Sequence, residues 1–155
     1  MGMEKKLRRL EELPAMLQGR KTVLANGCFD ILHVGHLRYL EGARRLGDVL
    51  VVAVNSDISI RAIKDEGRPL LNQDERVALV AALACVDHVV VFDEPDVSRV
   101  LDVLRPPIHA KGTDYTEQSV PERAKVLAYG GSVRITGDAK NHSTRDIIER
   151  ILKTL

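Results

Sequence analysis

An unbroken apolar run before the middle of the chain places the strictest limit on its fold. The run is Val49-Leu50-Val51-Val52-Ala53-Val54, and no polar residue alternates with the apolar ones. A strand of this composition fits a sheet that is covered on both faces, as parallel strands in α/β proteins are. The run ends in Asn55, Ser56 and Asp57. The carboxyl ends of strands in open α/β sheets face the ligand, so we expect these polar residues near a site.

Apolar segments and helical patterns alternate along the whole chain. Strands are expected at residues 22–25, 49–54, 86–92, 108–111 and 132–136, and helices at 37–46, 72–84, 95–104, 120–129 and 145–155. Five strands that alternate with helices predict a parallel sheet with helices on both faces, a Rossmann-like three-layer sandwich. Right-handed crossovers favour the strand order 3-2-1-4-5, with a switch point between strands 1 and 4.

The length of the chain, 155 residues, fits one domain with a real core, and no repeat or linker divides it. We therefore predict a single domain over residues 1–155. The first 20 residues are expected to form a peripheral amphipathic helix, bent near Pro14, in which leucines recur at helical spacing. These leucines, which could cover the domain's own core or a partner subunit, are Leu7, Leu10, Leu13 and Leu17.

The composition excludes several classes of partner. The net charge is +1 and aromatic residues make up 3% of the chain, without Trp. Bulk attraction to nucleic acid or to a membrane surface is therefore not expected, nor are stacking platforms for bases. No apolar run approaches membrane-spanning length. Two cysteines suggest no disulfide framework, which suits a cytoplasmic protein.

The stretch from Asn26 to His36 joins the first expected strand to a helical pattern, and reads Asn-Gly-Cys-Phe-Asp-Ile-Leu-His-Val-Gly-His. A helix N-terminus offers unpaired N–H groups and the positive end of a dipole, so it readily binds phosphate. His33 and His36 can add hydrogen-bond donors or positive charge there, and Gly35 lets an anion approach the backbone. We interpret the stretch as a triphosphate cradle. In the alternative interpretation, two histidines merely begin a helix, one as its cap.

Four segments are expected to converge at the carboxyl edge of the sheet: residues 26–36, 55–76, 111–115 and 138–144. Together they supply cations, imidazoles, hydroxyls and helix N-termini with few carboxylates, a balance that suits the binding and activation of phosphates. The chain has neither a P-loop pattern nor G-x-G-x-x-G after its first strand, so a P-loop kinase or a dinucleotide dehydrogenase is not expected. The two histidines lack the partners of a zinc site, and no protein metal site is predicted.

The same stretch resembles the HxGH signature of the nucleotidylyltransferase superfamily. From about Val23 to Ile151 the chain is similar to the cytidylyltransferase-like family, which includes glycerol-3-phosphate cytidylyltransferases and heptose-1-phosphate adenylyltransferases. Its motifs are most similar to those of the heptose enzymes. Besides residues 26–36, the motifs that carry this likeness are Val52 to Asp57, Gly67-Arg68-Pro69, Glu75-Arg76, Lys111-Gly-Thr-Asp-Tyr115 and Ser143-Thr144.

The resemblance implies transfer of AMP from ATP to D-glycero-β-D-manno-heptose 1-phosphate, which gives ADP-heptose for lipopolysaccharide core and releases pyrophosphate. The attacking phosphate oxygen is already a nucleophile, so positioning and charge neutralisation carry the rate. Magnesium (Mg2+) would enter with ATP, held mostly by phosphate oxygens and water. Related domains are often fused to a sugar kinase and commonly pair, so we expect a separate heptose kinase in the pathway and a homodimer.

The converging segments and the resemblance together predict three sets of site residues. The catalytic residues are expected to be His33, His36 and Lys64. The nucleotide is expected to contact Asn26, Gly27, Cys28, Phe29, His33, Gly35, His36, Lys111, Gly112, Asp114, Ser143 and Thr144. The second substrate is expected to contact Asp30, Asn55, Asp57, Lys64, Arg68 and Arg76.

Some positions depart from the family pattern and leave alternatives open. Thr113 stands where the family usually has glycine, and Arg145 where it usually has threonine. The glycerol-phosphate enzymes carry Arg-Thr-x-Gly before the Ser-Thr pair, where this chain has residues 137–142. Lys140 or His142 could replace that arginine's charge, or the loop could be solvated. The alternatives are a cytidylyltransferase for glycerol 3-phosphate or another small phosphate, an adenylyltransferase of the FAD or coenzyme A pathway, and a non-catalytic nucleotide-sensing module.

Overall fold

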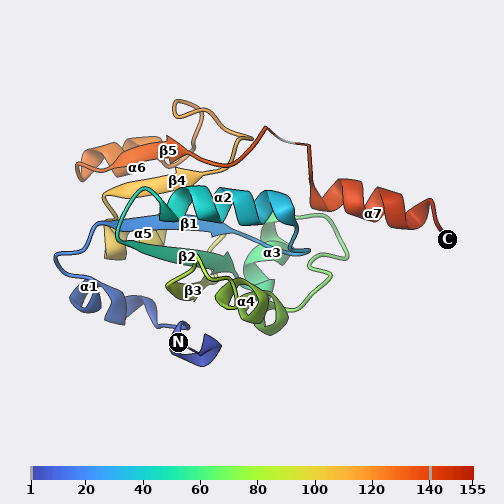
Figure 1. Cartoon of the computed structure of the whole chain (residues 1–155), viewed down its shortest axis with the longest axis horizontal. Coiled ribbons are helices and arrows are strands. Elements are labelled where there is room, and N and C mark those ends of the chain that lie inside the picture. The colour runs from blue at the N-terminus through green and yellow to red at the C-terminus, as the bar shows by residue number, and fades with distance from the viewer. Residues whose placement is uncertain (1, 140) are drawn as a thin grey trace.

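A computed structural model describes residues 2–139 and 141–155 of the chain. Its centre is a five-stranded sheet in the order β3-β2-β1-β4-β5, with every neighbouring pair parallel (Figure 1). The predicted fold class and strand order are therefore confirmed. The strands are β1 (Thr22–Gly27), β2 (Val49–Asn55), β3 (His88–Phe92), β4 (Ile108–Lys111) and β5 (Ser132–Ile135).

Helices cover both faces of the sheet, and the side chains of β1 and β2 alternate between two cores. Helices α2 (Val34–Arg44) and α4 (Gln73–Ala81) pack with Val23, Ala25 and Leu50. On the other face, α1 (Leu13–Met16), α5 (Ser98–Leu104) and α6 (Arg123–Ala128) pack with Leu24 and Val51. Every residue of β2 is buried, which is why its apolar run has no polar alternation. None of the described helices is long and apolar enough to span a membrane.

The start of the chain differs from its prediction. Within residues 2–20 the expected single helix does not form; two 3₁₀ turns, η1 (Met3–Lys5) and η2 (Leu10–Glu12), precede α1. Between the turns the chain pairs with the edge strand β3, since Arg8 N–H donates to Val89 C=O and Val89 N–H donates to Lys6 C=O, both at 2.9 Å. An edge strand has unpaired main-chain groups, and satisfying them outweighs the helical spacing of the leucines. Pro14 lies in the first turn of α1, where it needs no hydrogen bond.

A second difference lies after β2, where the sequence analysis assigned no helix between the strand at 49–54 and the helix at 72–84. Helix α3 (Asp57–Ile63) forms there, and the Ser56 hydroxyl caps it by accepting from Ser59 N–H at 3.1 Å. A serine cap followed by an acidic residue is a helix-start signal that the sequence did contain. Residues 64–72 then form the loop that closes one side of the carboxyl edge, and α7 (Thr144–Leu152) ends the chain apart from the sheet (Figure 1).

Tyr39 of α2 sits where the two central strands stop pairing. Strands β1 and β4 share only two register pairs, Val23↔Ile108 and Leu24↔His109. Just beyond the second pair, the Tyr39 hydroxyl donates to Ala110 C=O at 2.7 Å and accepts from Asn26 N–H at 3.3 Å. The hydroxyl thus replaces the missing ladder bonds, and the switch point opens without leaving main-chain groups unpaired.

The Tyr39 hydroxyl is expected to stabilise the fold measurably. Tyr39→Phe leaves a buried carbonyl and an N–H group unpaired, and it should lower the free energy of unfolding in urea by about 1–3 kcal/mol. Tyr129→Phe is the matched control, because its half-buried hydroxyl makes one hydrogen bond, to Pro106 C=O at 2.8 Å. The control should cost about 1 kcal/mol or less. Equal losses in the two variants would contradict the role of Tyr39 at the switch point.

Candidate active site

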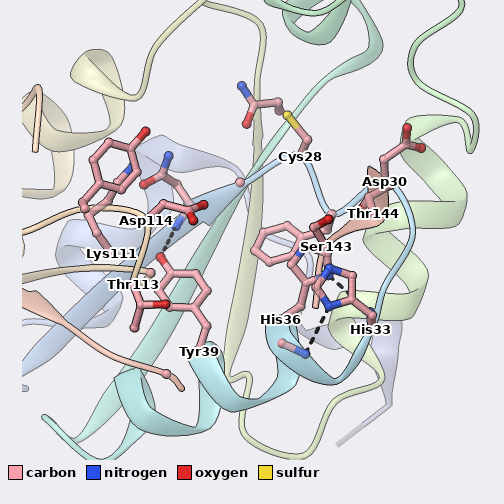
Figure 2. Close-up of a pocket in the computed structure, with 18 of the residues that line it drawn as sticks. Cys28, Asp30, His33, His36, Tyr39, Lys111, Thr113, Asp114, Ser143 and Thr144 are labelled. Carbon is pink, nitrogen blue, oxygen red and sulfur yellow. Dashed lines mark hydrogen bonds between the residues drawn. The ribbon is translucent and has the colours of Figure 1, made fainter. Parts of the chain in front are cut away.

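A cavity of about 570 Å³ opens at the carboxyl edge of the sheet (Figure 2). Residues from all four predicted segments line it. The structure therefore brings together most of the predicted site residues, although their contacts with ligands stay a prediction. Asp57 and Arg76 do not line this cavity. The predicted residues that do are Asn26, Gly27, Cys28, Phe29, Asp30, His33, Gly35, His36, Asn55, Lys64, Arg68, Lys111, Gly112, Asp114, Ser143 and Thr144.

His33 and His36 cap the N-terminus of α2 with their own rings. The His33 Nδ1 accepts from Gly35 N–H at 3.1 Å, and the His36 Nδ1 accepts from His33 N–H at 3.2 Å. The rings stack with their centroids 3.8 Å apart. Because each Nδ1 is an acceptor, each neutral ring carries its proton on Nε2. A Cβ at residue 35 would lie 2.9 Å from the His33 ring, so glycine is required where the ring folds back.

His36 acts as a neutral donor rather than as a cation. Burial, and then the charge of His33, lower the pKa of His36 to about 4. The ring of Phe29 packs against His36 edge-on, at a centroid distance of 5.3 Å, and so supports its orientation. Phe29 itself is buried with a positive φ of 49°, a conformation that side chains other than glycine rarely adopt. Of the two roles the sequence allowed, donor and charge, the structure supports the donor for His36.

The positive charge on the opposite wall comes from Lys111, at the end of β4. Its side chain is nearly buried, and burial lowers the pKa of Lys111 while the nearby charge of Glu122 raises it. The ammonium lies 4.7 Å from the centroid of the Tyr115 ring, a cation–π contact. The Oε2 atom of Glu122 is buried without a hydrogen-bond partner in the described structure. Glu122 lines the cavity and was missed by the sequence analysis.

A second helix N-terminus reaches the same cavity. Ser143 caps α7 by accepting from Asp146 N–H at 3.0 Å, and both Ser143 and Thr144 line the cavity. A Cβ on Gly35 would lie 3.6 Å from the His142 Cβ, so the loop before α7 lies against the start of α2. Two helix N-termini therefore serve one site, an arrangement that suits a polyphosphate. Lys140, the other residue singled out in this loop, lies outside the described residues.

Asp30 lines the cavity, but its carboxylate holds the loop of residues 64–72. It accepts from Arg68 Nη1 at 2.9 Å and from the main-chain N–H groups of Leu70 and Leu71, each at 2.9 Å. Burial alone would raise the pKa of Asp30, yet the N–H groups of Leu71 and Leu70 and the Arg68 guanidinium hold it below its usual value. Asp30 therefore tethers the loop to the signature, and its contact with a substrate stays a prediction.

Arg76 is fully buried, with an exposed fraction of 0%, and the predicted contact with a substrate phosphate is not supported. Its guanidinium donates to Cys28 C=O and Asn55 C=O at 2.7 Å, to Leu71 C=O at 3.0 Å and to the Asp57 carboxylate at 2.9 Å. These partners belong to the signature, the end of β2, the loop and α3. The same ion pair engages the Oδ1 of Asp57, whose contact with the second substrate stays a prediction.

The remaining predicted residues differ in how free their polar atoms are. Asn55 is buried, and its Nδ2 donates to the Ser59 hydroxyl at 2.9 Å. Burial raises the pKa of Cys28, so its side chain is a thiol rather than a thiolate. Lys64 follows α3, is exposed, and lines both the main cavity and a second, more open one beside the loop of residues 64–72. Lys64 is therefore placed to reach a ligand in the main cavity.

Several polar residues in and around the cavity escaped the sequence analysis. Tyr39 follows His36 by one turn of helix, a spacing that could have revealed it. His109 stands in an otherwise apolar strand segment and gave no signal beyond that contrast. Arg38 forms an ion pair with Asp138 at 2.6 Å, and the Thr113 hydroxyl donates to Asp138 C=O at 2.6 Å. Thr113, one of the departures from the family pattern, therefore ties the turn after β4 to the loop before α7.

Comparison with known proteins agrees with this geometry. The cytidylyltransferase-like family matches residues 24–150. The bifunctional protein HldE of Syntrophotalea carbinolica is 48% identical over 96% of this chain, and that of Geobacter sulfurreducens is 51% identical over 88%. The chain spans only 31% and 28% of the lengths of these relatives.

Solved structures extend the comparison. The lipopolysaccharide core biosynthesis protein of Thermoplasma volcanium shares 33% identity, with a TM-score of 0.64, over 76% of this chain and 94% of that one. Pantothenate synthetase of Thermus thermophilus superposes with a TM-score of 0.67 over 92% of this chain and 67% of that one. Its identity is 18%, so this likeness concerns the fold alone.

Arg76 is expected to matter for stability. Arg76→Met keeps much of the side-chain volume but leaves the Asp57 carboxylate and three carbonyls without their donor. The free energy of unfolding, measured in urea, should fall by about 3–5 kcal/mol. Arg61→Met on the exposed face of α3 is the control and should change it by less than about 0.5 kcal/mol. An Arg76→Met variant as stable as the control would restore the substrate role.

Proposed function

Because the chain belongs to the cytidylyltransferase-like family, we propose that it transfers AMP from ATP to a sugar 1-phosphate, D-glycero-β-D-manno-heptose 1-phosphate. The products are ADP-heptose and pyrophosphate. The chain is a nucleotidyltransferase domain, and we propose that residues 1–155 form one such unit. The choice of a heptose phosphate is supported by the identity to the HldE proteins and to a protein of lipopolysaccharide core biosynthesis.

One observation carries this proposal: helix N-termini, imidazole donors and lysine ammonium groups meet in one cavity, which carboxylates also line. Two helix N-termini, the Nε2–H group of His36 and the ammonium groups of Lys64 and Lys111 face or border it. The nearest carboxylate of the signature, Asp30, is already committed to the loop. A ligand with several negatively charged oxygens is therefore favoured over a neutral or cationic one.

The proposed reaction is an in-line displacement at phosphorus. An oxygen of the sugar phosphate forms a bond to the α-phosphorus of ATP, and the bond from that phosphorus to the bridging oxygen of the β-phosphate breaks. Charge moves onto the α-phosphate oxygens and the leaving pyrophosphate, where His33, His36 and Lys64 would stabilise it. The attacking oxygen is already anionic, so no general base is required. Ser143 and Thr144 would hold the β- and γ-phosphates at the start of α7.

Magnesium fits this site as a companion of the nucleotide. Within residues 2–139 and 141–155, no three His, Cys, Asp or Glu side chains gather as a metal site. Mg2+ keeps several waters and commonly binds through substrate phosphates, so a cavity that supplies no full ligand set suits it. When bound it would neutralise phosphate charge. We further propose a cytoplasmic homodimer that receives its sugar phosphate from a separate heptose kinase.

The proposal is tested by a screen for pyrophosphate release. ATP, CTP and GTP are each combined with heptose 1-phosphate, glycerol 3-phosphate, FMN and phosphopantetheine. Release is expected with ATP and heptose 1-phosphate at least tenfold above every other pair. Release with CTP alone would favour the cytidylyltransferase alternative. Tight nucleotide binding without release from any pair would favour the nucleotide-sensing module.

His36→Asn isolates the proposed transition-state donor. The Asn Oδ1 can take the place of Nδ1 and accept from His33 N–H, so the cap and the fold should persist, but the Nε2–H group is lost. Turnover should fall by about 10²–10³-fold, the usual loss when one such donor is removed. His88→Asn on the opposite end of the sheet is the control and should turn over like the wild type. Turnover within twofold of wild type in His36→Asn would show that His36 does not serve the transition state.

A further inference from the structure

A buried histidine that the reaction scheme does not use lies beside the cavity. His109 of β4 has an exposed fraction of 0%, and its Nε2 lies 2.9 Å from the Oδ1 of Asn26. Its Nδ1 is buried and has no hydrogen-bond partner in the described part of the chain. Burial of a polar ring lowers the stability of the fold unless hydrogen bonds of the ring compensate for its lost hydration.

The strand register explains why this ring meets Asn26. Leu24 and His109 are paired in the parallel ladder, so their side chains share one face of the sheet. Asn26 lies two residues beyond Leu24 on the same face, at the level where β1 and β4 have stopped pairing. The His109 ring therefore links the two strands at the switch point through the Asn26 side chain. The Tyr39 hydroxyl links the same strands through their main-chain groups.

The position of the ring's proton follows from its surroundings. Burial, and then the charge of Lys111, lower the pKa of His109 to about 3, so the ring is neutral and holds one proton. A proton on Nδ1 would be a donor without any acceptor in the core, which native structures rarely tolerate. A proton on Nε2 instead donates to the Oδ1 of Asn26 and leaves only a lone pair unpaired.

We propose that His109 is a positioning residue that orients the Asn26 amide, so that the amide presents its NH2 group to the cavity rather than its carbonyl. With Oδ1 committed to His109, the two Nδ2 donors remain, and none of the described residues accepts from them. Asn26 lines the cavity together with Lys111, so its NH2 group and the Lys111 ammonium can both donate to ligand oxygens. The inference rests on the proposed function. It attributes part of the cavity's preference for phosphate-rich ligands to His109, which would not contact the ligand itself.

The tautomer is measured directly, without any reaction. Nitrogen-15 spectra of the histidine side chains should show His109 with its proton on Nε2 and unchanged between pH 5 and pH 8. His88, which is partly exposed at the start of β3, provides a second histidine in the same sheet for comparison, and His109→Gln identifies the signals. A proton on Nδ1 of His109 would overturn the proposal, because Asn26 would then turn its carbonyl to the cavity.

A double-mutant cycle tests the action of His109 through Asn26. His109→Leu should raise the Kd for ATP, measured by calorimetry, or lower kcat/KM, by about tenfold in the wild-type background. In the Asn26→Ala background the same change should have less than a twofold effect, because no amide remains to be oriented. His109→Gln, whose amide can donate to the Asn26 Oδ1, should recover at least half of the change in the logarithm of Kd or kcat/KM. His88→Leu is the matched control, with no effect expected in either background.

A purely structural role for His109 predicts a different pattern. The loss on His109→Leu would then persist unchanged in the Asn26→Ala background and would follow the melting temperature, and that result would overturn the inference. Failure of the proposed function is recognised separately, since wild-type protein would release no pyrophosphate from any pair. In that case the tautomer and the ATP-affinity cycle still decide the role of His109.

Discussion

The buried guanidinium of Arg76 holds together main-chain segments that lie far apart in the sequence. Its donors satisfy carbonyls at the end of β2, in the signature and in the loop, while the Asp57 carboxylate balances its charge. Breaking such a pair leaves an uncompensated charge in the core, so the three segments hold their places together or not at all. The tether from Asp30 to residues 68–71 depends on this arrangement, because the signature must be in position before Asp30 can bind the loop.

The site that this frame supports combines polar side chains with main-chain groups of two helix N-termini. The caps of α2 and α7 leave helix N–H groups directed at one cavity, and the His33 and His36 rings are held as N–H donors by hydrogen bonds to that same backbone. Neutral donors in a partly buried cavity need no counter-charge when the ligand is absent, whereas buried cations would. This explains how the cavity can suit a triphosphate while His36 stays uncharged and the pKa of Lys111 is lowered.

Features that depend on local sequence pattern were predicted correctly. Features that depend on contacts between distant segments were not. The alternation of apolar strands with helical patterns and the strand-to-helix signature are local features, and they predicted the sheet order and the segments that line the cavity. The role of Arg76 did not, because a cation near a phosphate site resembles a ligand contact until its burial is known. The first 20 residues failed likewise, since pairing with the edge of β3 cannot be seen in the spacing of leucines.

Commitment of polar atoms narrows the residues that can select the second substrate. Asp30 accepts a hydrogen bond from Arg68, and Asp57 accepts one from Arg76. The Nδ2 of Asn55 donates to the Ser59 hydroxyl. In the proposed reaction, discrimination between sugar, glycerol and larger phosphates would fall to cavity-lining groups that are not already committed. Such groups include the ammonium of Lys64, the amide NH2 of Asn26 and the unpaired Oε2 of Glu122. Donors beside carboxylate acceptors suit a ligand that carries both phosphate oxygens and hydroxyl groups, as the proposed sugar phosphate does.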